Sequence, residues 1–257
     1  MTSSFTNFNK MRENELGAEF VKYATKHENI KKGELDAHFG FDVEASMTPY
    51  ILEERKMRVT QMDIFSRLMR DRIIWLAGPV NDRMSTVAQA QLMFLDNVEK
   101  KDITLHIDSP GGSVKSGLSI VDVMDYIKSD IQTVNTGMCA SMGSVLLGAG
   151  TPGKRSSLRF SSVMCHQVSH GTRGNIQDTR ITHLEGEKAN YILGKLLAQY
   201  SGKDFDEYMD TVERDKWYTS EEAKEFGLID EVIESKGSSI SELLDGFGDY
   251  YTKMNKI

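Results

Sequence analysis

The residue type best suited to nucleophilic chemistry lies in a run of small residues, Gly137 to Ser144. Its central hydroxyl is Ser141, with Cys139 two positions earlier. A strand-like run, 131–136, precedes it, and an apolar run with small residues, 145–149, follows it. A strand that turns sharply into a helix presents a serine beside unpaired backbone N–H groups, which favour a developing negative charge. The pattern predicts a nucleophilic serine, and a buried turn packed with small residues is the alternative that it leaves open.

A nucleophilic serine needs a base, and His166 is the strongest candidate among the six histidines. It ends an alternating apolar run, where a side chain can project into a cleft, although histidines at strand ends are often structural. His166 and His170 are also spaced like metal ligands, but no acidic or sulfur ligand follows at a suitable spacing, so we expect no metal. An acid should orient the imidazole. Asp178, Asp210 and Asp215 all lie downstream, and the residues alone leave the choice open.

Two other motifs resemble functional sites but fail on context. Residues 148–154 satisfy the G-x4-G-K spacing of a phosphate-binding loop, but Arg155 stands where a magnesium-binding hydroxyl is required. The motif also follows an expected helix and precedes an expected strand, which reverses the order that such loops need. Cys139 fits a small apolar space better than a nucleophilic role. We therefore expect no nucleotide and no other cofactor.

The composition fits a globular protein and excludes several classes of function. Of the 257 residues 39% are apolar, which is enough for a sizeable core in one domain. The 38 acidic and 31 basic residues give a formal charge of −7, which argues against a dedicated nucleic-acid binder. No apolar run approaches the ~20 residues of a membrane-spanning helix, and no signal core opens the chain. With only two cysteines, we expect a cytoplasmic protein with no membrane partner.

The elements that must position these residues alternate between strand and helix. We expect strands at 72–77, 103–107, 131–136, 155–160 and 162–167, and helices at 85–97, 114–127, 178–200, 204–213 and 220–226. In the helix 85–97, Ser85 fits the N-cap position, and one side carries a largely apolar stripe made of Val87, Gln91, Phe94, Leu95 and Val98. The alternation predicts an α/β fold with parallel strand pairing.

Four segments are expected along the chain. Residues 1–46 form an N-terminal extension or propeptide that processing can remove, and residues 47–62 form a charged arm. The compact domain spans residues 63–234. Residues 235–257 begin with a link rich in serine and glycine and are expected to form a flexible C-terminal tail.

Six short motifs, taken together, resemble the proteolytic subunits of the Clp protease family (ClpP). The resemblance runs from about Pro49 to Ile233 and keeps the motifs in the family order. The motifs are Phe65-Ser66-Arg67-Leu68, Asp108-Ser109-Pro110-Gly111-Gly112, Gly137-Met138-Cys139-Ala140-Ser141-Met142-Gly143, Gly153-Lys154-Arg155, Val163-Met164-Cys165-His166-Gln167 and Glu213-Arg214-Asp215. Any one of them alone is a weak signal, whereas six in the right order are specific.

The resemblance implies a serine endopeptidase that hydrolyses unfolded polypeptides to short peptides. Ser141 matches the family nucleophile, His166 its base and Asp215 its orienting acid. Asp215 is assigned only through this match, in the last of the six motifs. The backbone N–H groups of Gly112 and Met142 match the oxyanion hole. A side chain in the Gly-Gly turn would obstruct a substrate strand lying against the backbone.

The resemblance also implies an architecture and partners. The fold is the crotonase-like spiral of ββα units, with the helix 178–200 as a protruding handle. In the family two heptameric rings stack through these handles into a tetradecamer, which supplies a partner for a helix that Gly186 and Gly194 weaken by about 1 kcal/mol each. Arg214 matches a position where ring contacts couple to the triad. A Clp-family ATPase, ClpX- or ClpA/ClpC-like, feeds polypeptide through an axial pore, near which the arm 47–62 is expected.

Two departures from the family pattern motivate an alternative function. The segment Val168 to Gly171 replaces a proline and a glycine pair, and Thr104 and His106 replace tyrosines of the groove that docks the ATPase. The alternative is a noncatalytic or weakly active ring subunit that co-assembles with a ClpP paralogue. A third candidate is an acyl-CoA enzyme of the crotonase class, which shares the fold and the oxyanion logic but needs no Ser/His/Asp set.

Overall fold

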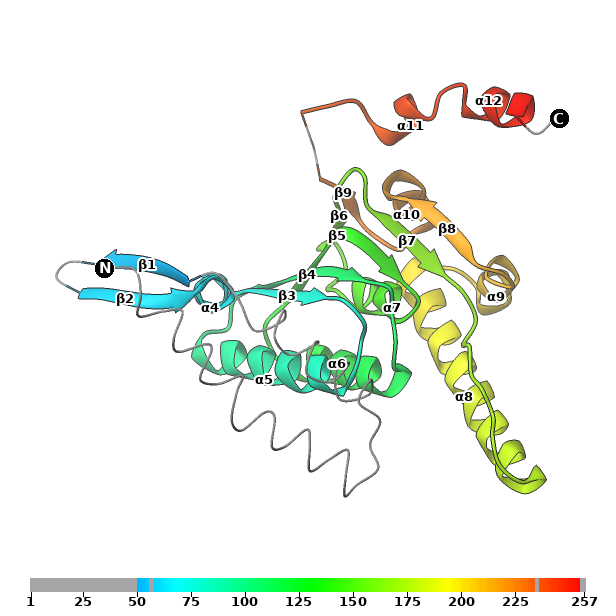
Figure 1. Cartoon of the computed structure of the whole chain (residues 1–257), viewed down its shortest axis with the longest axis horizontal. Coiled ribbons are helices and arrows are strands. Elements are labelled where there is room, and N and C mark those ends of the chain that lie inside the picture. The colour runs from blue at the N-terminus through cyan, green and yellow to red at the C-terminus, as the bar shows by residue number, and fades with distance from the viewer. Residues whose placement is uncertain (1–49, 56–57, 234–235, 255–257) are drawn as a thin grey trace, which may run out of the picture. The chain divides into compact units, whose positions relative to one another are not determined.

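The computed structural model describes residues 50–55, 58–233 and 236–254 (Figure 1). The expected N-terminal extension, 1–46, lies outside the described residues. The chain divides into two compact units, Met1–Ile64 and Phe65–Ile257. Within the first, β1 (Tyr50–Arg55) and β2 (Arg58–Asp63) form an antiparallel hairpin in which Tyr50 pairs with Asp63. The expected charged arm therefore contains regular structure.

A mixed sheet organises the second unit. Its strands are β3 (Ile73–Ala77), β4 (Ile103–Ser109), β5 (Ile131–Ala140), β6 (Arg155–Ser157), β7 (Ser162–Cys165), β8 (Lys216–Thr219) and β9 (Glu231–Val232). The order β3-β4-β5-β6-β9 is parallel throughout. β7 adds in parallel to the end of β5, and β8 pairs antiparallel with β7. This sheet confirms the predicted α/β class.

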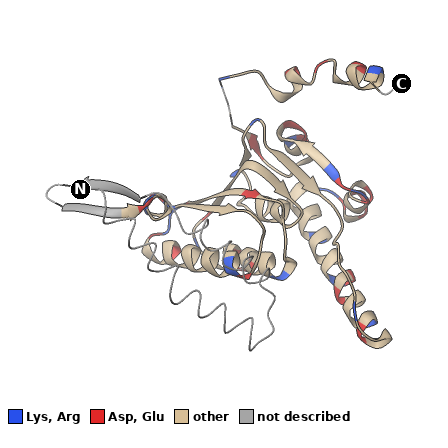
Figure 2. Cartoon of the chain, viewed as in Figure 1, with Lys and Arg blue, Asp and Glu red and all other residues tan. Residues whose placement is uncertain are grey.

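Helices connect the strands. They are α4 (Ile64–Arg70), α5 (Asp82–Val98), α6 (Val114–Tyr126), α7 (Met142–Gly148), α8 (Ile176–Ser201), α9 (Phe205–Thr211), α10 (Ser220–Phe226), α11 (Ile240–Leu243) and α12 (Phe247–Met254). α5 and α6 lie side by side next to β3 and β4, and α8 projects away from the sheet as the expected handle does (Figure 1). Charged residues of both signs lie along α8, whereas the strands of the mixed sheet are mostly uncharged (Figure 2).

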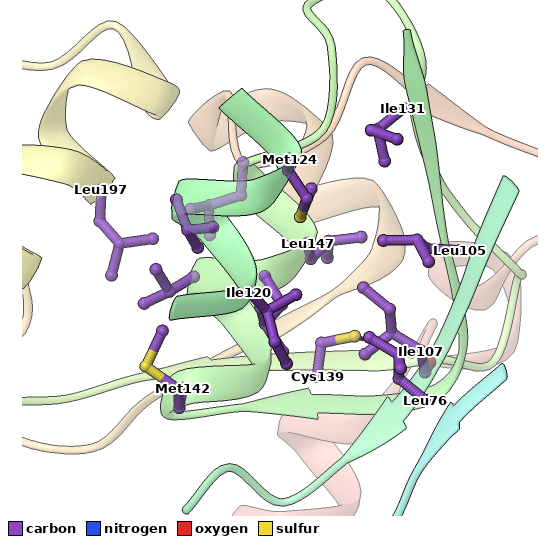
Figure 3. Packing of buried hydrophobic residues seen from close by; sticks show 14 of the residues in the cluster. Leu76, Leu105, Ile107, Ile120, Met124, Ile131, Cys139, Met142, Leu147 and Leu197 are labelled. Atoms are coloured by element: carbon purple, nitrogen blue, oxygen red, sulfur yellow. Dashed lines mark hydrogen bonds between the residues drawn. The ribbon is translucent and has the colours of Figure 1, made fainter. Parts of the chain in front are cut away.

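The core places α6 and α7 against the sheet near Ser141. Leu105 of β4, Ile120 of α6 and Leu147 of α7 are fully buried together (Figure 3). α6 approaches the residue after Ser141 so closely that a Cβ on Gly117 would lie 2.3 Å from the Cγ atom of Met142. The buried Met142 side chain therefore anchors the start of α7 in the core.

The predicted cap of α5 is wrong. The helix begins three residues earlier than expected, and its N-cap is Asn81, whose side chain accepts a hydrogen bond from the N–H of Met84 at 2.9 Å. Ser85 lies inside the helix and is buried. Its hydroxyl donates to the carbonyl of Ser116 in α6 at 2.8 Å. Asn and Ser are both good caps, and the sequence does not reveal that Ser85 is used for helix packing instead.

The predicted stripe of α5 meets the core only in part, because Leu95 is buried whereas Val87, Phe94 and Val98 are exposed. The residues buried against the sheet are Ala88, Leu92 and Leu95, which share one side of the helix. The exposed fractions of the other apolar stripe residues are 49% for Val87, 57% for Phe94 and 64% for Val98. The helix therefore has two apolar faces, and helical periodicity alone does not say which one meets the chain's own core.

Contacts within the chain explain both glycines of α8. A Cβ on Gly194 would lie 2.6 Å from the sulfur of Met209 in α9, and one on Gly186 would lie 3.0 Å from the imidazole of His170. The glycines let α9 and the loop before α8 approach the helix axis. These contacts give a reason within the chain for both glycines, and whether α8 also packs on a partner stays a prediction.

The C-terminal segment contains structure that the sequence analysis did not predict. α11 has a capping box formed by Ser239 and Glu242, and the N–H of Ser241 donates to the carboxylate of Glu221 in α10 at 3.1 Å. Arg159 donates to the carbonyl of Ser238. The segment 236–244 is therefore tied to the domain by hydrogen bonds.

Candidate active site

Ser141 lies at the junction of β5 and α7, as the strand-turn-helix prediction requires. Its backbone has φ 54° and ψ −121°, a left-handed conformation that non-glycine residues rarely adopt. The N–H of Ser141 donates to the carbonyl of Met164 in β7 at 2.9 Å. The carbonyl of Ser141 accepts hydrogen bonds from the N–H and the hydroxyl of Ser144 at 3.0 and 2.7 Å. These bonds hold the hydroxyl-bearing residue on both sides.

Strand pairing brings His166 to Ser141. Ala140, at the end of β5, pairs with Met164 of β7, and His166 follows β7 directly. The His166 Nε2 atom lies 2.9 Å from the Ser141 Oγ atom, within hydrogen-bond distance. The His166 side chain is 22% exposed, so it reaches solvent and a substrate from one side.

Strand pairing also brings Asp215 to His166, here between β7 and β8. β7 and β8 are antiparallel with Cys165 opposite Lys216, so the next opposed pair outward is His166 and Asp215. The Asp215 Oδ1 atom lies 3.3 Å from the His166 Nδ1 atom. Of the other two candidate acids, Asp178 is bonded to Asn175 at the start of α8, and Asp210 is an exposed residue of α9. The structure therefore selects one of three acids that the residues alone left open.

A glycine turn lies against the Ser141 backbone. A Cβ on Gly111 would lie 2.6 Å from the Cβ of Ser141, and one on Gly112 would lie 2.3 Å from the carbonyl oxygen of Val80. Close packing within the chain thus requires both glycines, whereas the sequence analysis attributed them to room for a substrate. Within the described residues the N–H groups of Gly112 and Met142 donate to no acceptor. Both are available to a ligand beside Ser141.

A pocket of about 200 Å³ opens beside Ser141 and His166. We call it the Ser141 pocket. Its apolar lining comes mainly from α6, α7, α8 and α9, and its polar lining comes from Ser141, from the residues after β7 and from these helices. The lining includes Val114, Met142, Ser144, Val145, Ser169, Asn190, Leu193, Leu197, Tyr208, Met209 and Val212.

Two residues that the sequence analysis did not single out position this site. The Ser109 hydroxyl accepts a hydrogen bond from the N–H of Gly111 at 3.1 Å and donates to the carbonyl of Gly78 at 2.7 Å. The Asn190 side chain on α8 accepts from the N–H of Val168 at 2.9 Å and ties down the loop after His166. Ser109 lies inside a recognised motif, so its position was a usable signal. No local pattern marks Asn190.

Arg214 lies beside Asp215 but makes no ion pair or hydrogen bond within the described part of the chain, and its side chain is exposed. The lysine of the phosphate-loop motif, Lys154, forms salt bridges instead of facing a free anion site. It pairs with Asp102 at 2.6 Å and with Asp130 at 2.9 Å, so its ammonium group is held by two carboxylates. No helix among the described residues combines the length and apolarity needed to cross a membrane.

Comparison with known proteins decides the family. The family model described as Clp protease matches residues 54–236, which include every residue of the site. The chain belongs to the Clp protease family. It is 49% identical over 223 residues to the ATP-dependent Clp protease proteolytic subunit of Bacteroides fragilis strain YCH46, covering 85% of this chain and 99% of that protein. It is 44% identical over 217 residues to the protein of that name from Porphyromonas gingivalis, covering 84% and 97%.

Membership of the Clp protease family confirms the resemblance predicted from the six motifs. The relatives are proteolytic subunits, and the chain is accordingly a serine peptidase of this family. The alternatives of a noncatalytic ring subunit and of an acyl-CoA enzyme are not favoured. The departures at Val168 to Gly171, Thr104 and His106 are thus variations within the family.

Proposed function

We propose that Ser141, His166 and Asp215 form the catalytic triad of this peptidase. The observation that carries the proposal is the 2.9 Å contact between the His166 Nε2 and Ser141 Oγ atoms, the distance that a proton transfer needs. Asp215 on the other imidazole nitrogen favours the tautomer with the proton on Nδ1, which leaves the Nε2 lone pair facing the serine.

The steps follow from this geometry. His166 accepts the Ser141 proton as the hydroxyl oxygen attacks the carbonyl carbon of a peptide bond. The carbonyl oxygen becomes an oxyanion and accepts hydrogen bonds from the N–H groups of Gly112 and Met142. His166 then protonates the leaving amine, and an acyl group remains on Ser141. Water, activated by His166, releases the acyl group and restores the serine.

The Ser141 pocket receives the substrate side chain on the acyl side of the cleaved bond. It adjoins the nucleophile, and apolar residues such as Val145 and Leu197 line it. The loop after His166 contributes Ser169 to the same wall. Because this loop departs from the family pattern, we expect a cleavage preference that differs from that of relatives with the Pro and Gly-Gly sequence.

We further propose that the chain works as two stacked heptameric rings that enclose the active sites. The support is apolar surface that the chain itself does not cover: Ile181 and Leu184 on α8 are 63% and 56% exposed, and Phe94 on α5 is 57% exposed. Arg214, adjacent to the proposed acid, couples ring contacts to the triad. Mixed rings with a paralogue are a variant of this arrangement.

The names of the relatives, ATP-dependent Clp protease proteolytic subunit, support an ATPase partner. We propose that a Clp-family ATPase, ClpX- or ClpA/ClpC-like, feeds unfolded polypeptides to these rings in the cytoplasm, and that the hairpin of β1 and β2 lies near the axial pore. Residues 1–46 are proposed to be removed before assembly.

The decisive experiment compares wild type with Ser141→Ala. Cleavage of short fluorogenic peptides should fall by at least about 10⁴-fold, while native mass spectrometry shows the same assembly. A fluorophosphonate probe should label wild type at Ser141 and leave the variant unlabelled. Peptide cleavage by the variant near the wild-type rate would remove Ser141 from its proposed role.

A further inference from the structure

The loop between His166 and α8 makes one side-chain contact that the proposed mechanism does not use. The His170 Nε2 atom lies 3.3 Å from the Nδ1 atom of His183 on α8, and the two rings stack with their centroids 5.4 Å apart. For residues 169–174 this is the only hydrogen bond, ion pair or ring contact within the described part of the chain. The pair of imidazoles therefore fixes this part of the loop to the helix.

The surface of α8 leaves room for the His170 imidazole. A Cβ on Gly186, three residues after His183, would lie 3.0 Å from three atoms of the His170 ring, so the ring lies directly on the helix backbone. The N–H of Val168 donates to the side chain of Asn190 on the same helix at 2.9 Å. The loop thus has two anchors on α8, one before and one after residue 169.

The loop that His170 fixes forms part of the walls around His166. Val168 and Ser169 line the Ser141 pocket. The same two residues line a second cavity of about 500 Å³, which His166 also borders. A shift of the loop would therefore change the surroundings of His166 in both cavities.

The contact between the two imidazoles depends on how many protons the pair carries. With at most one extra proton, one of the two facing nitrogens donates and the other accepts. The carboxylate of Glu187 lies 3.6 Å from the His183 Nε2 atom and favours that proton on His183. With both rings protonated, two N–H groups and two like charges face each other, so the hydrogen bond is lost.

The other charged groups beside the pair increase this repulsion. On α8, the element that His170 packs against, Arg180 lies three residues before His183, and the loop itself carries Arg173. Neither arginine forms an ion pair within the described residues, and His170 has no carboxylate partner there. Histidine side chains in general gain a proton between pH 5 and 8, so acid pH selects the state in which the contact is broken.

We propose that His170 is a positioning residue, whose contact with His183 holds the loop after His166 in place for peptide cleavage and releases it when both imidazoles are protonated. The inference rests on the proposed peptidase function and adds a regulation of that site by acid pH. His166 must itself be neutral to act as a base, so acid pH lowers activity for that reason as well. The test therefore compares variants at each pH instead of absolute rates.

The test measures kcat/KM for an uncharged fluorogenic peptide in wild type, His170→Gln and His170→Ala at pH 7.5 and pH 5.5. Glutamine can donate and accept a hydrogen bond but takes up no proton in this range. At pH 7.5 we expect wild type and His170→Gln to agree within twofold, and His170→Ala to be about 3- to 10-fold slower, the effect of one lost hydrogen bond. At pH 5.5 the ratio of His170→Gln to wild type should rise about 3- to 10-fold.

The matched control is Lys188→Gln, which removes a positive charge from α8. Lys188 pairs with Glu185 and not with the imidazoles, so the ratio of this variant to wild type should not change with pH. His183→Gln should reproduce the pH effect of His170→Gln, and the double variant should add nothing, because each change prevents the same double protonation.

The outcomes separate the inference from the proposed function. If the ratio of His170→Gln to wild type stays constant within twofold between the two pH values, while wild type cleaves the peptide and a fluorophosphonate probe labels Ser141, the inference is overturned and the proposed function stands. Wild type that neither cleaves nor labels at pH 7.5 overturns both.

Discussion

His166 and Asp215 lie opposite each other at the outer end of the antiparallel pair β7 and β8, one step beyond Cys165 and Lys216. The ladder thus sets the distance between imidazole and carboxylate. Asp215 is 65% exposed, so water competes for its carboxylate in the single chain. The contact between His166 and Asp215 therefore depends on the register of β7 and β8 and on whether another group shields the Asp215 carboxylate from water.

Asp215→Asn should lower kcat for peptide cleavage about 10²–10⁴-fold, because an amide can hold the wrong imidazole tautomer. The exposure of Asp215 favours the lower end of this range. Steady-state kinetics with a short peptide measures the effect, and native mass spectrometry checks that assembly is retained. A decrease of less than threefold would show that Asp215 does not orient His166.

Gly112→Ala should lower kcat/KM about 10²–10³-fold, the cost of one lost oxyanion donor. The new Cβ would lie 2.3 Å from the carbonyl oxygen of Val80, so the turn must move. Gly153→Ala is the matched control. Gly153 also has a positive φ, of 85°, but a Cβ there meets nothing within 4 Å. Equal losses in the two variants would point to general strain instead of a displaced N–H group.

Gly186→Ala should uncouple stability from activity. Alanine adds about 1 kcal/mol of helix propensity to α8, yet its Cβ would lie 3.0 Å from the His170 imidazole and displace the loop after His166. We expect an unchanged or higher melting temperature with kcat/KM about 10- to 100-fold lower. The double variant Gly186→Ala with His170→Ala should recover activity relative to the single one. A fully active Gly186→Ala protein would contradict the proposed role of this contact.

Asp96 makes the stability of the α5 region depend on acid pH. Hydrogen bonds from Lys100 and then from Ser129 and Lys128 lower the pKa of Asp96 to about 2, although burial opposes this shift. In the unfolded chain the pKa is about 3.9. Because the folded pKa is the lower one, the stabilisation is complete above pH ~4 and is lost as the pH falls toward 2. Urea unfolding of wild type and Asp96→Asn should therefore converge as the pH is lowered from 5 to 2.5; a constant difference would exclude this carboxylate as the cause.

Leu184→Asp should disrupt the proposed stacking of rings. Leu184 is 56% exposed on α8, so a carboxylate costs little in the single chain but much in an apolar interface. Native mass spectrometry should show smaller assemblies and the peptide assay a lower rate. Gln177→Asp, at a polar exposed position of the same helix, is the control. Intact double rings in Leu184→Asp would place the ring contact elsewhere.

The sequence predicted the parts of the site that depend on local pattern. The strand-turn-helix around Ser141 and the strand that ends at His166 follow from periodicity and small residues. Asp215 does not, because its approach to His166 depends on the register of two strands about fifty residues apart. Its assignment came from a family motif, and geometry now supports the same residue.

The errors have a common physical cause. Of the apolar residues in the predicted stripe of α5 only Leu95 reaches the core, because amphipathic spacing does not distinguish residues that meet the core from neighbours that stay exposed in the single chain. For the glycines of α8, the sequence shows the loss of helix stability but not the contacts that require a glycine. Their helix cost is visible in sequence, while the side chains that occupy the space beside them, Met209 and His170, come from elsewhere in the chain.

The strained backbone of Ser141 sets the stability of this protein against the presence of a side chain at position 141. At φ 54° glycine is the least strained residue, so the proposed nucleophile Ser141 is held in a backbone conformation that serine disfavours. Replacement by glycine should therefore give a dead protein that resists heat better than the one that works.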